Sequence, residues 1–128
     1  AIAGDAAADR YALPKLASNI EDEPNNTTRF VVLGQQSAGA SGRDKTSLIM
    51  SAPNRTGSLS YLLAPFSDAG VSMTRLESRP ARHTLWEYVF YVDVEGHRDD
   101  PQVAAALTEL AQRAAYFKVL GSYPVAAY

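Results

Sequence analysis

Residues 86–95 alternate between two kinds of side chain. One side of the alternation is strongly apolar and the other is mixed; the apolar members are Trp86, Tyr88, Phe90, Val92 and Val94. A period of two is the pattern of a β-strand with one buried face. Such a strand cannot bury that face alone, so the rest of the chain must supply a sheet and something to cover it.

Strand and helix patterns alternate from residue 45 onward. Strands are predicted at 46–51, 71–77, 86–95 and 117–121, with a bulge in the second near Thr74-Arg75 and a stop at Pro80. Helices are predicted at 59–66, kinked at Pro65 and closed by a left-handed Gly70, and after Asp100-Pro101 with a buried stripe of Val103, Leu107, Leu110 and Ala114. The order β-α-β-β-α-β predicts an α+β fold, a ferredoxin-like antiparallel sheet with both helices on one face.

The first 44 residues are less regular. Residues 2–18 are rich in alanine and predict two short helices with a break near Pro14, and residues 27–33 are β-branched and apolar, which favours a strand. Residues 34–44 are small or polar and predict a flexible linker. We therefore divide the chain into 1–33, 34–44 and 45–128. Because it starts without Met inside an alanine-rich pattern, we interpret it as part of a longer protein.

Composition excludes several classes of partner. A net charge of −2 creates no single-sign field for nucleic acid or lipid, and the absence of cysteine excludes disulfides and thiolate chemistry. No apolar run approaches the roughly 20 residues of a membrane span. The sequence predicts a soluble cytoplasmic protein with no cofactor and no nucleic-acid or membrane partner.

Motifs in a fixed order give the chain a family resemblance. They are Asp44-Lys45-Thr46-Ser47-Leu48, Asn54-x-x-Gly57-x-Leu59, Met73-Thr74-x-x-Glu77-Ser78-Arg79-Pro80, Phe90-Tyr91-x-Asp93-x-Glu95-Gly96-His97 and Leu120-Gly121-Ser122-Tyr123-Pro124. Together, residues 44–124 resemble the regulatory ACT domain of prephenate dehydratase. Upstream, Asn26-Thr27-Thr28-Arg29-Phe30 resembles the end of that enzyme's catalytic domain. Two adjoining matches in the right order are stronger than either alone.

The resemblance implies an activity and its regulation. Enzymes of this family are carbon–oxygen lyases of L-phenylalanine biosynthesis that convert prephenate to phenylpyruvate, water and CO2. They are inhibited by L-phenylalanine bound to ACT domains in a homodimer or higher homo-oligomer. Because most of the catalytic domain is missing from these 128 residues, we expect the chain alone to be inactive as a dehydratase.

The resemblance also implies an allosteric ligand site between subunits. Its residues here are Asn54, Gly57, Ser58 and Leu59 at a helix start, and Glu77, Ser78, Arg79 and Pro80 at a strand exit. A helix N-terminus attracts an anion such as an amino acid's carboxylate, and glycine allows close approach. The family usually has Gly-Ala-Leu-Val after proline at the helix start, whereas Thr56, Ser58 and Ser60 make this pocket wall more polar. Without the family, Glu77 and Arg79 would be interpreted as solvated surface charges.

Thr28, Arg29 and Phe30 match the family's catalytic Thr-Arg-Phe motif. The resemblance implies that the Thr28 hydroxyl faces the departing ring hydroxyl and acts through its position, since threonine is a poor acid. Arg29 would bind a substrate carboxylate with its planar guanidinium. Taken alone, such a tripeptide on a strand is more often structural.

Three alternatives remain from the sequence. The acidic cluster around His97 resembles a metal site, but calcium-loop spacing fails and a solvated face with no metal is favoured. The aromatic strand resembles that of RNA-recognition sheets, but the glycine-bearing lead-in is missing and the chain is acidic. A non-catalytic amino-acid sensor or assembly module with a different ligand is the second hypothesis, which the Thr28-Arg29 pair argues against.

Overall fold

The alternating strand becomes β3, Tyr88–Glu95, in the computed structural model of this chain. The structure describes residues 1–24, 28–52, 55–81 and 88–126, so Trp86 and Glu87 lie outside the described residues. Residues 1–33 form one compact unit and residues 34–128 a second. We describe each unit by itself.

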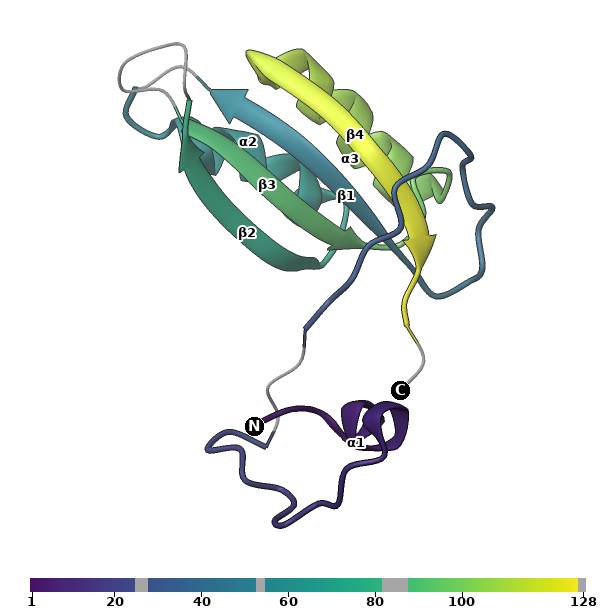
Figure 1. The fold of residues 1–128 in the computed structure, drawn as a ribbon. Helices are drawn as coiled ribbons and strands as arrows, with labels where there is room; N and C mark the ends of the chain where they lie inside the picture. The colour runs from purple at the N-terminus through teal and green to yellow at the C-terminus, as the bar shows by residue number, and fades with distance from the viewer. Residues whose placement is uncertain (25–27, 53–54, 82–87, 127–128) are drawn as a thin grey trace. The chain divides into compact units, whose positions relative to one another are not determined.

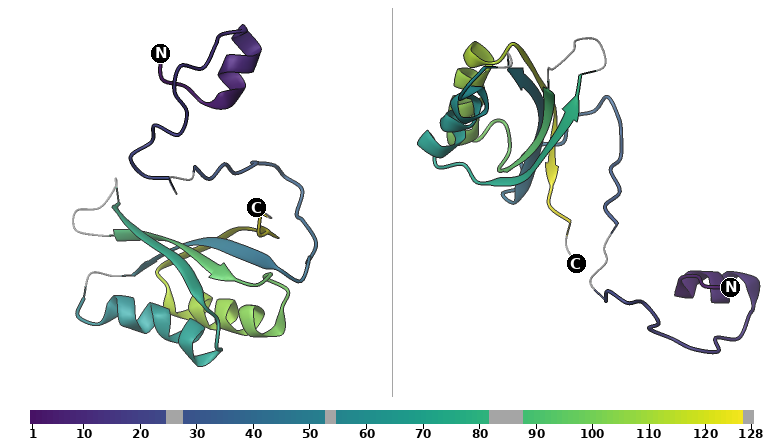
Figure 2. Two further views of the ribbon diagram at one scale, coloured as in Figure 1. Left: turned by 90° about the horizontal axis from the view of Figure 1, so that it is seen from below. Right: turned by 90° about the vertical axis from the view of Figure 1, so that its left-hand side faces the viewer.

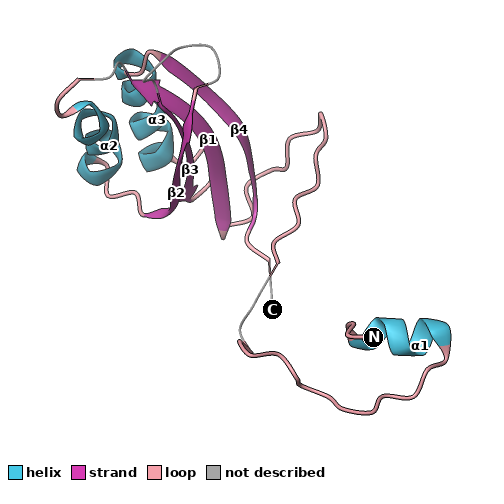
Figure 3. Ribbon diagram, turned by 60° about the vertical axis from the view of Figure 1, so that its left-hand side comes forward, coloured by secondary structure: helices cyan, strands magenta, loops and turns pink. Residues whose placement is uncertain are grey.

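Four strands and two helices build the second unit in the predicted order. The elements are β1 Asp44–Ala52, α2 Ser58–Asp68, β2 Met73–Pro80, β3, α3 Pro101–Arg113 and β4 Tyr116–Pro124. The sheet order is β2-β3-β1-β4 with antiparallel neighbours, and both helices cover the same face (Figures 1, 2 and 3). The ferredoxin-like prediction is confirmed.

The core lies between that sheet face and the helices. Its buried members are Leu48, Met50, Leu62, Phe66, Val71, Val92, Val94, Val103, Ala106, Leu107 and Leu110. Leu48 and Met50 share the parity of β1 that faces the helices, as Val92 and Val94 do on β3. Each fully buried large side chain stabilises the fold by roughly 1.5–3 kcal/mol. The stripe predicted on α3 is buried except for Ala114, which is partly buried.

Two bulges adjust the sheet. The β2–β3 register shifts between Met73 and Arg75, as the mixed parity of the sequence predicts. A second shift opposite Ser47 and Leu48 makes Leu120 the extra residue of β4, which the sequence did not indicate. Beyond the first bulge, β2 continues to Pro80, where the missing N–H ends the ladder.

Helix α2 continues through Pro65. Proline has no N–H to donate to the Tyr61 carbonyl, which leaves that oxygen without its helical partner. The Arg113 guanidinium on α3 supplies one: Nη1 donates to the Tyr61 oxygen at 2.8 Å, and its Cζ lies 4.6 Å from the centre of the Tyr61 ring. The helix therefore extends to Asp68, and Gly70 takes the predicted left-handed conformation with φ 67°.

The first unit contains one helix, α1 Asp5–Tyr11, ended by Ala12 in the left-handed conformation. The second short helix predicted before residue 18 is absent from the described residues 12–24, so that prediction is wrong. Residues 28–33 are not a strand either. A strand needs a neighbour for its backbone hydrogen bonds, and none of the described strands lies in this unit. No described helix has the length and apolar character to cross a membrane.

Candidate functional site

The first part of the candidate site is the start of α2. Gly57 precedes the helix with φ 78°, a left-handed conformation that favours glycine. The Ser58 N–H donates to the Arg55 carbonyl at 3.2 Å, and the Tyr61 N–H to the Gly57 carbonyl at 2.9 Å. Apart from its chain neighbours, no atom of the described residues would lie within 4 Å of a β-carbon on Gly57, so this part of the chain leaves the surface beside it open. Asn54 lies outside the described residues.

The next turns of α2 present a shallow groove. It is lined by Leu59, Ser60, Leu63, Ala64, Ser67 and Asp68. Leu59 and Leu63 also pack against the core, which fixes the groove's apolar side. The helix start and the groove together present an apolar surface beside the positive end of a helix dipole. An amino acid with an apolar side chain and a carboxylate complements that arrangement.

The second part is an ionic cluster on β2. Glu77 lies between two arginines: the Arg79 Nε donates to its Oε1 at 2.8 Å, and the Arg75 Nη2 donates to its Oε2. These hydrogen bonds, Arg79's first and then Arg75's, lower the pKa of Glu77, and Glu77 in turn raises the pKa of Arg79. The Arg79 Cζ also lies 5.8 Å from the centre of the Tyr91 ring. Glu77 is thus a carboxylate at neutral pH, held by exposed cations.

The four residues of the predicted strand exit do not form one patch. Glu77 pairs with Tyr91 and Arg79 with Val89, so both lie on the sheet face away from the helices. Ser78 pairs with Phe90 and lies on the opposite face at the exposed edge of the sheet. Pro80 ends the strand. Because β2 runs parallel to β1, its exit lies at the same end of the sheet as the start of α2 (Figure 1).

The predicted catalytic residues lie in the first unit. Thr28, Arg29 and Phe30 follow one another without helix or strand, and Phe30 is 89% exposed. The α2 start and the β2 exit belong to the second unit. The described residues of the first unit supply no buried surface around them: Val32 and Leu33 are exposed as well.

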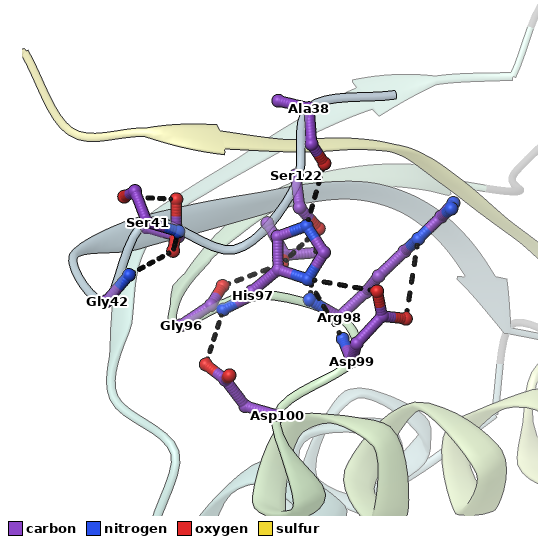
Figure 4. A network of polar contacts seen from close by, with 11 residues as sticks. Ala38, Ser41, Gly42, Gly96, His97, Arg98, Asp99, Asp100 and Ser122 are labelled. Atoms are coloured by element: carbon purple, nitrogen blue, oxygen red, sulfur yellow. Dashed lines mark hydrogen bonds and ion pairs between the residues drawn. The ribbon is translucent and has the colours of Figure 1, made fainter. Parts of the chain in front are cut away.

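A buried polar cluster at the opposite end of the sheet was missed by the sequence reasoning (Figure 4). His97 is only 2% exposed and Asp93 4%, so the prediction of a solvated acidic face is wrong for both. Asp93 accepts a hydrogen bond from the Ser47 Oγ at 2.5 Å. Alternation alone put Asp93 on the polar side of β3, but polar partners on β1 allow it to be buried. Among the described residues, no group of three or more acidic or histidine side chains could hold a metal ion.

The sequence also favours Asp100 as the capping residue of the helix that starts at Pro101, and the structure differs in its side chain. It occupies the position before α3, with Pro101 first in the helix as expected, yet its side chain makes no bond to the helix's own N–H groups. Instead the Asp100 Oδ2 accepts from the His97 N–H at 2.7 Å. The carboxylate therefore ties the helix start to the turn that carries His97.

Comparisons with known proteins agree with this architecture. The family model of the ACT domain matches residues 46–112, and that of prephenate dehydratase matches residues 1–38. A bifunctional chorismate mutase/prephenate dehydratase of Neisseria gonorrhoeae is 56% identical over 126 residues, which is 98% of this chain and 35% of that relative. A prephenate dehydratase of Mycobacterium sp. (strain KMS) is 42% identical over 120 residues, covering 92% of this chain and 38% of its own length.

Solved structures extend the comparison. A prephenate dehydratase from Arthrobacter aurescens in complex with L-Phe superposes with a TM-score of 0.66 at 34% identity, over 72% of this chain and 30% of that one. GqqA, described as a novel type of quorum quenching acylase, superposes with a TM-score of 0.68 at 33% identity, over 73% of this chain and 34% of its own. The chain thus spans about a third of the length of the relatives it matches.

Proposed function

Because the chain belongs to the prephenate dehydratase family and contains its ACT domain, we propose that it is the regulatory part of such an enzyme, with a short catalytic segment before it. In this proposal residues 1–33 belong to the catalytic domain, 34–44 connect the two parts, and 45–128 bind the regulator. The whole enzyme converts prephenate to phenylpyruvate with loss of water and CO2.

The proposed regulator is L-phenylalanine. The observation that carries this choice is the start of α2, where a left-handed Gly57 leaves open surface at the positive end of the helix beside the apolar side of the groove. The Arthrobacter relative, whose structure contains L-Phe, supports the ligand class. Binding would inhibit the dehydratase, as feedback control of the pathway requires.

A homodimer completes the proposed site. Asn54, Gly57, Ser58 and Leu59 of one subunit would face Glu77, Ser78, Arg79 and Pro80 of the other. Glu77 supplies a carboxylate for the ligand's ammonium group, and the two arginines flanking Glu77 hold it in its charged form. The polar Ser58 and Ser60 line the same corner.

The catalytic part of the proposal rests on Thr28, Arg29 and Phe30. Thr28 would position the departing hydroxyl and Arg29 would bind a substrate carboxylate. Their exposure in the first unit is consistent with residues that require the remainder of a catalytic domain around them. We therefore expect the 128-residue chain to show no dehydratase activity with prephenate.

Calorimetric titration of the chain with L-phenylalanine tests the regulatory proposal. We expect one ligand per chain in a dimer, with L-tyrosine and L-tryptophan binding more weakly. The mass in solution, measured on the same sample, checks that the chain is a dimer. Gly57→Ala should weaken the binding of L-phenylalanine about tenfold or more, because the added β-carbon would occupy the space through which the ligand's carboxylate approaches the helix start.

Gly70→Ala is the matched control for that substitution. Gly70 has φ 67° and open space around it, as Gly57 does, but it lies past the other end of α2. Its substitution should leave affinity unchanged. An equal loss of affinity in both variants would mean that the ligand does not bind at the start of α2. A folded dimer that binds another amino acid in place of L-phenylalanine would support the sensor hypothesis.

A further inference from the structure

The segment before β1 is held to the ACT domain through His97. The ring Nε2 of His97 lies 3.1 Å from the carbonyl oxygen of Ala38 (Figure 4). The ring Nδ1 accepts from the Asp99 N–H at 3.2 Å and lies 3.3 Å from the Asp99 Oδ2. A neutral ring with Nδ1 as acceptor and a protonated ring both carry a hydrogen on Nε2. In either state, therefore, His97 donates to Ala38.

A second contact fixes the same segment closer to β1. The Asp44 carboxylate accepts from the Ser41 N–H at 2.7 Å, the Ser41 Oγ at 2.7 Å and the Gly42 N–H at 3.1 Å. These bonds, led by that of the Ser41 hydroxyl, lower the pKa of Asp44. The Arg43 carbonyl also accepts from the Val125 N–H at 2.9 Å. Residues 41–44 therefore form a defined turn, although their composition predicted a flexible linker.

The turn that carries His97 is itself fixed on several sides. The Gly96 N–H donates to the Asp44 carbonyl at 2.8 Å, and the Thr46 hydroxyl donates to the Gly96 carbonyl at 2.7 Å. The Arg98 N–H donates to the Ser122 Oγ at 3.1 Å. With Asp100 holding the His97 N–H, the turn is tied to β1, β4 and α3. A movement of any of these elements would move the imidazole.

We propose that His97 is a positioning residue that anchors the connector at Ala38 and passes the state of the ACT domain to the catalytic segment. The inference rests on the proposed function. With the anchor, the free tether from Leu33 ends at Ala38 and reaches about 17 Å when extended; without it the tether would end at Ser41, where the turn to Asp44 begins, and reach about 27 Å. A shorter tether restricts where the catalytic segment can lie, so ligand-dependent movement is transmitted more strongly.

Two insertions in the whole dehydratase test this arrangement. Gly-Ser-Gly-Ser between Gln35 and Gln36 lengthens the free tether, whereas the same insert between Gly39 and Ala40 lies behind the anchor. The first should raise the L-phenylalanine concentration for half inhibition about fivefold or more, and the second less than about twofold. The rate without L-phenylalanine should be unchanged in both. Equal effects of the two insertions would overturn the proposal.

Substitution of the imidazole gives an independent measurement on the 128-residue chain. His97→Phe keeps a ring but removes the donor, and hydrogen exchange at the Ser41 and Gly42 amides should accelerate about 2–10-fold. His97→Gln, which can place an N–H near the position of Nε2, should recover most of the protection. Unchanged exchange in His97→Phe, with protected core strands, would refute the anchor.

Ligand binding by the same proteins separates the two proposals. His97→Phe should bind L-phenylalanine with wild-type affinity, because the residue lies at the end of the sheet opposite the ligand site. If the wild type does not bind L-phenylalanine, the proposed function fails while the exchange experiment still decides the anchor. If His97→Phe misfolds, the insertion pair decides it.

Discussion

The two ends of the sheet use polar residues in different ways. Around His97, polar groups are buried and bonded to one another across β1, β4 and α3, whereas around Glu77 the charges are exposed and bonded to neighbours on the same strand. Within the described residues, no buried polar side-chain atom lacks a partner. Buried, satisfied groups hold one geometry, because breaking any bond leaves an unpaired group out of water. Exposed ion pairs can exchange partners at little cost, which suits the ligand-binding role that we propose for this surface.

Two left-handed glycines, one at each end of the sheet, should show the largest difference in the stability cost of a substitution. Gly96→Ala should destabilise the chain by about 3 kcal/mol, because the β-carbon would lie 2.8 Å from the Val103 Cγ2 in addition to the unfavourable φ of 97°. Gly57→Ala should have only the backbone penalty, about 1–2 kcal/mol, since no neighbour among the described residues lies within 4 Å of the added β-carbon. Urea unfolding of both variants measures the difference. Equal losses would mean that the end of the sheet at His97 is as adaptable as the end at Gly57.

A buried hydroxyl at the His97 end can be compared with an exposed one. Thr46→Val removes the bond to the Gly96 carbonyl and the 2.8 Å contact with the Ser122 Oγ, and should cost about 1–3 kcal/mol in unfolding free energy. Thr108→Val makes the same chemical change on the exposed face of α3, where the hydroxyl donates to the Ala104 carbonyl. We expect less than about 0.5 kcal/mol there. A similar cost at both positions would show that burial of the cluster contributes little.

Arg113 tests whether one contact on α2, the helix that carries the proposed ligand site, is structural. Arg113→Met leaves the Tyr61 carbonyl without the donor that replaces the one missing at Pro65, and should cost about 1 kcal/mol. In a Pro65→Ala background the helix restores its own N–H donor, so the same substitution should cost less. Unfolding of the two single variants and the double variant measures this coupling. Purely additive costs would contradict the role of Arg113 as a substitute donor.

The smallest expected effect is that of the Glu77 cluster on stability. The pKa of Glu77 is depressed below its ordinary value of 4.5, so the folded state favours the carboxylate. Its contribution is present above about pH 4.5 and is lost as the pH falls through the lower folded pKa. Glu77→Gln should therefore lower Tm slightly at pH 7, with the gap from wild type closing under acid or in high salt. A Tm difference that does not change with pH would rule out an ionic origin of the stabilisation. In the same variant, we expect weaker binding of L-phenylalanine at pH 7.

The sequence predicted the ACT domain closely, because its signals are local. Each of these signals reflects a preference of a few consecutive residues, and the folded domain satisfies it. They are the alternation in β3, the i, i+3, i+4 spacing of α2, Pro101 at the start of α3 and the parity break at Thr74. Residues 27–33 have the same β-branched character, yet the described part of that run forms no strand. Propensity alone does not make a strand when the hydrogen-bonding neighbour is missing.

Residue types and spacing by themselves determined the order of elements, the helix and strand faces, and the positions that resemble the family's motifs. Only the tertiary structure decided that Glu77 and Arg79 share a face which Ser78 does not, that Arg113 satisfies the carbonyl opposite Pro65, and that His97 is buried against Ala38. The reason is physical. A backbone preference acts over a few residues, whereas burial of a polar group depends on partners brought from distant parts of the chain: 59 residues separate His97 from Ala38.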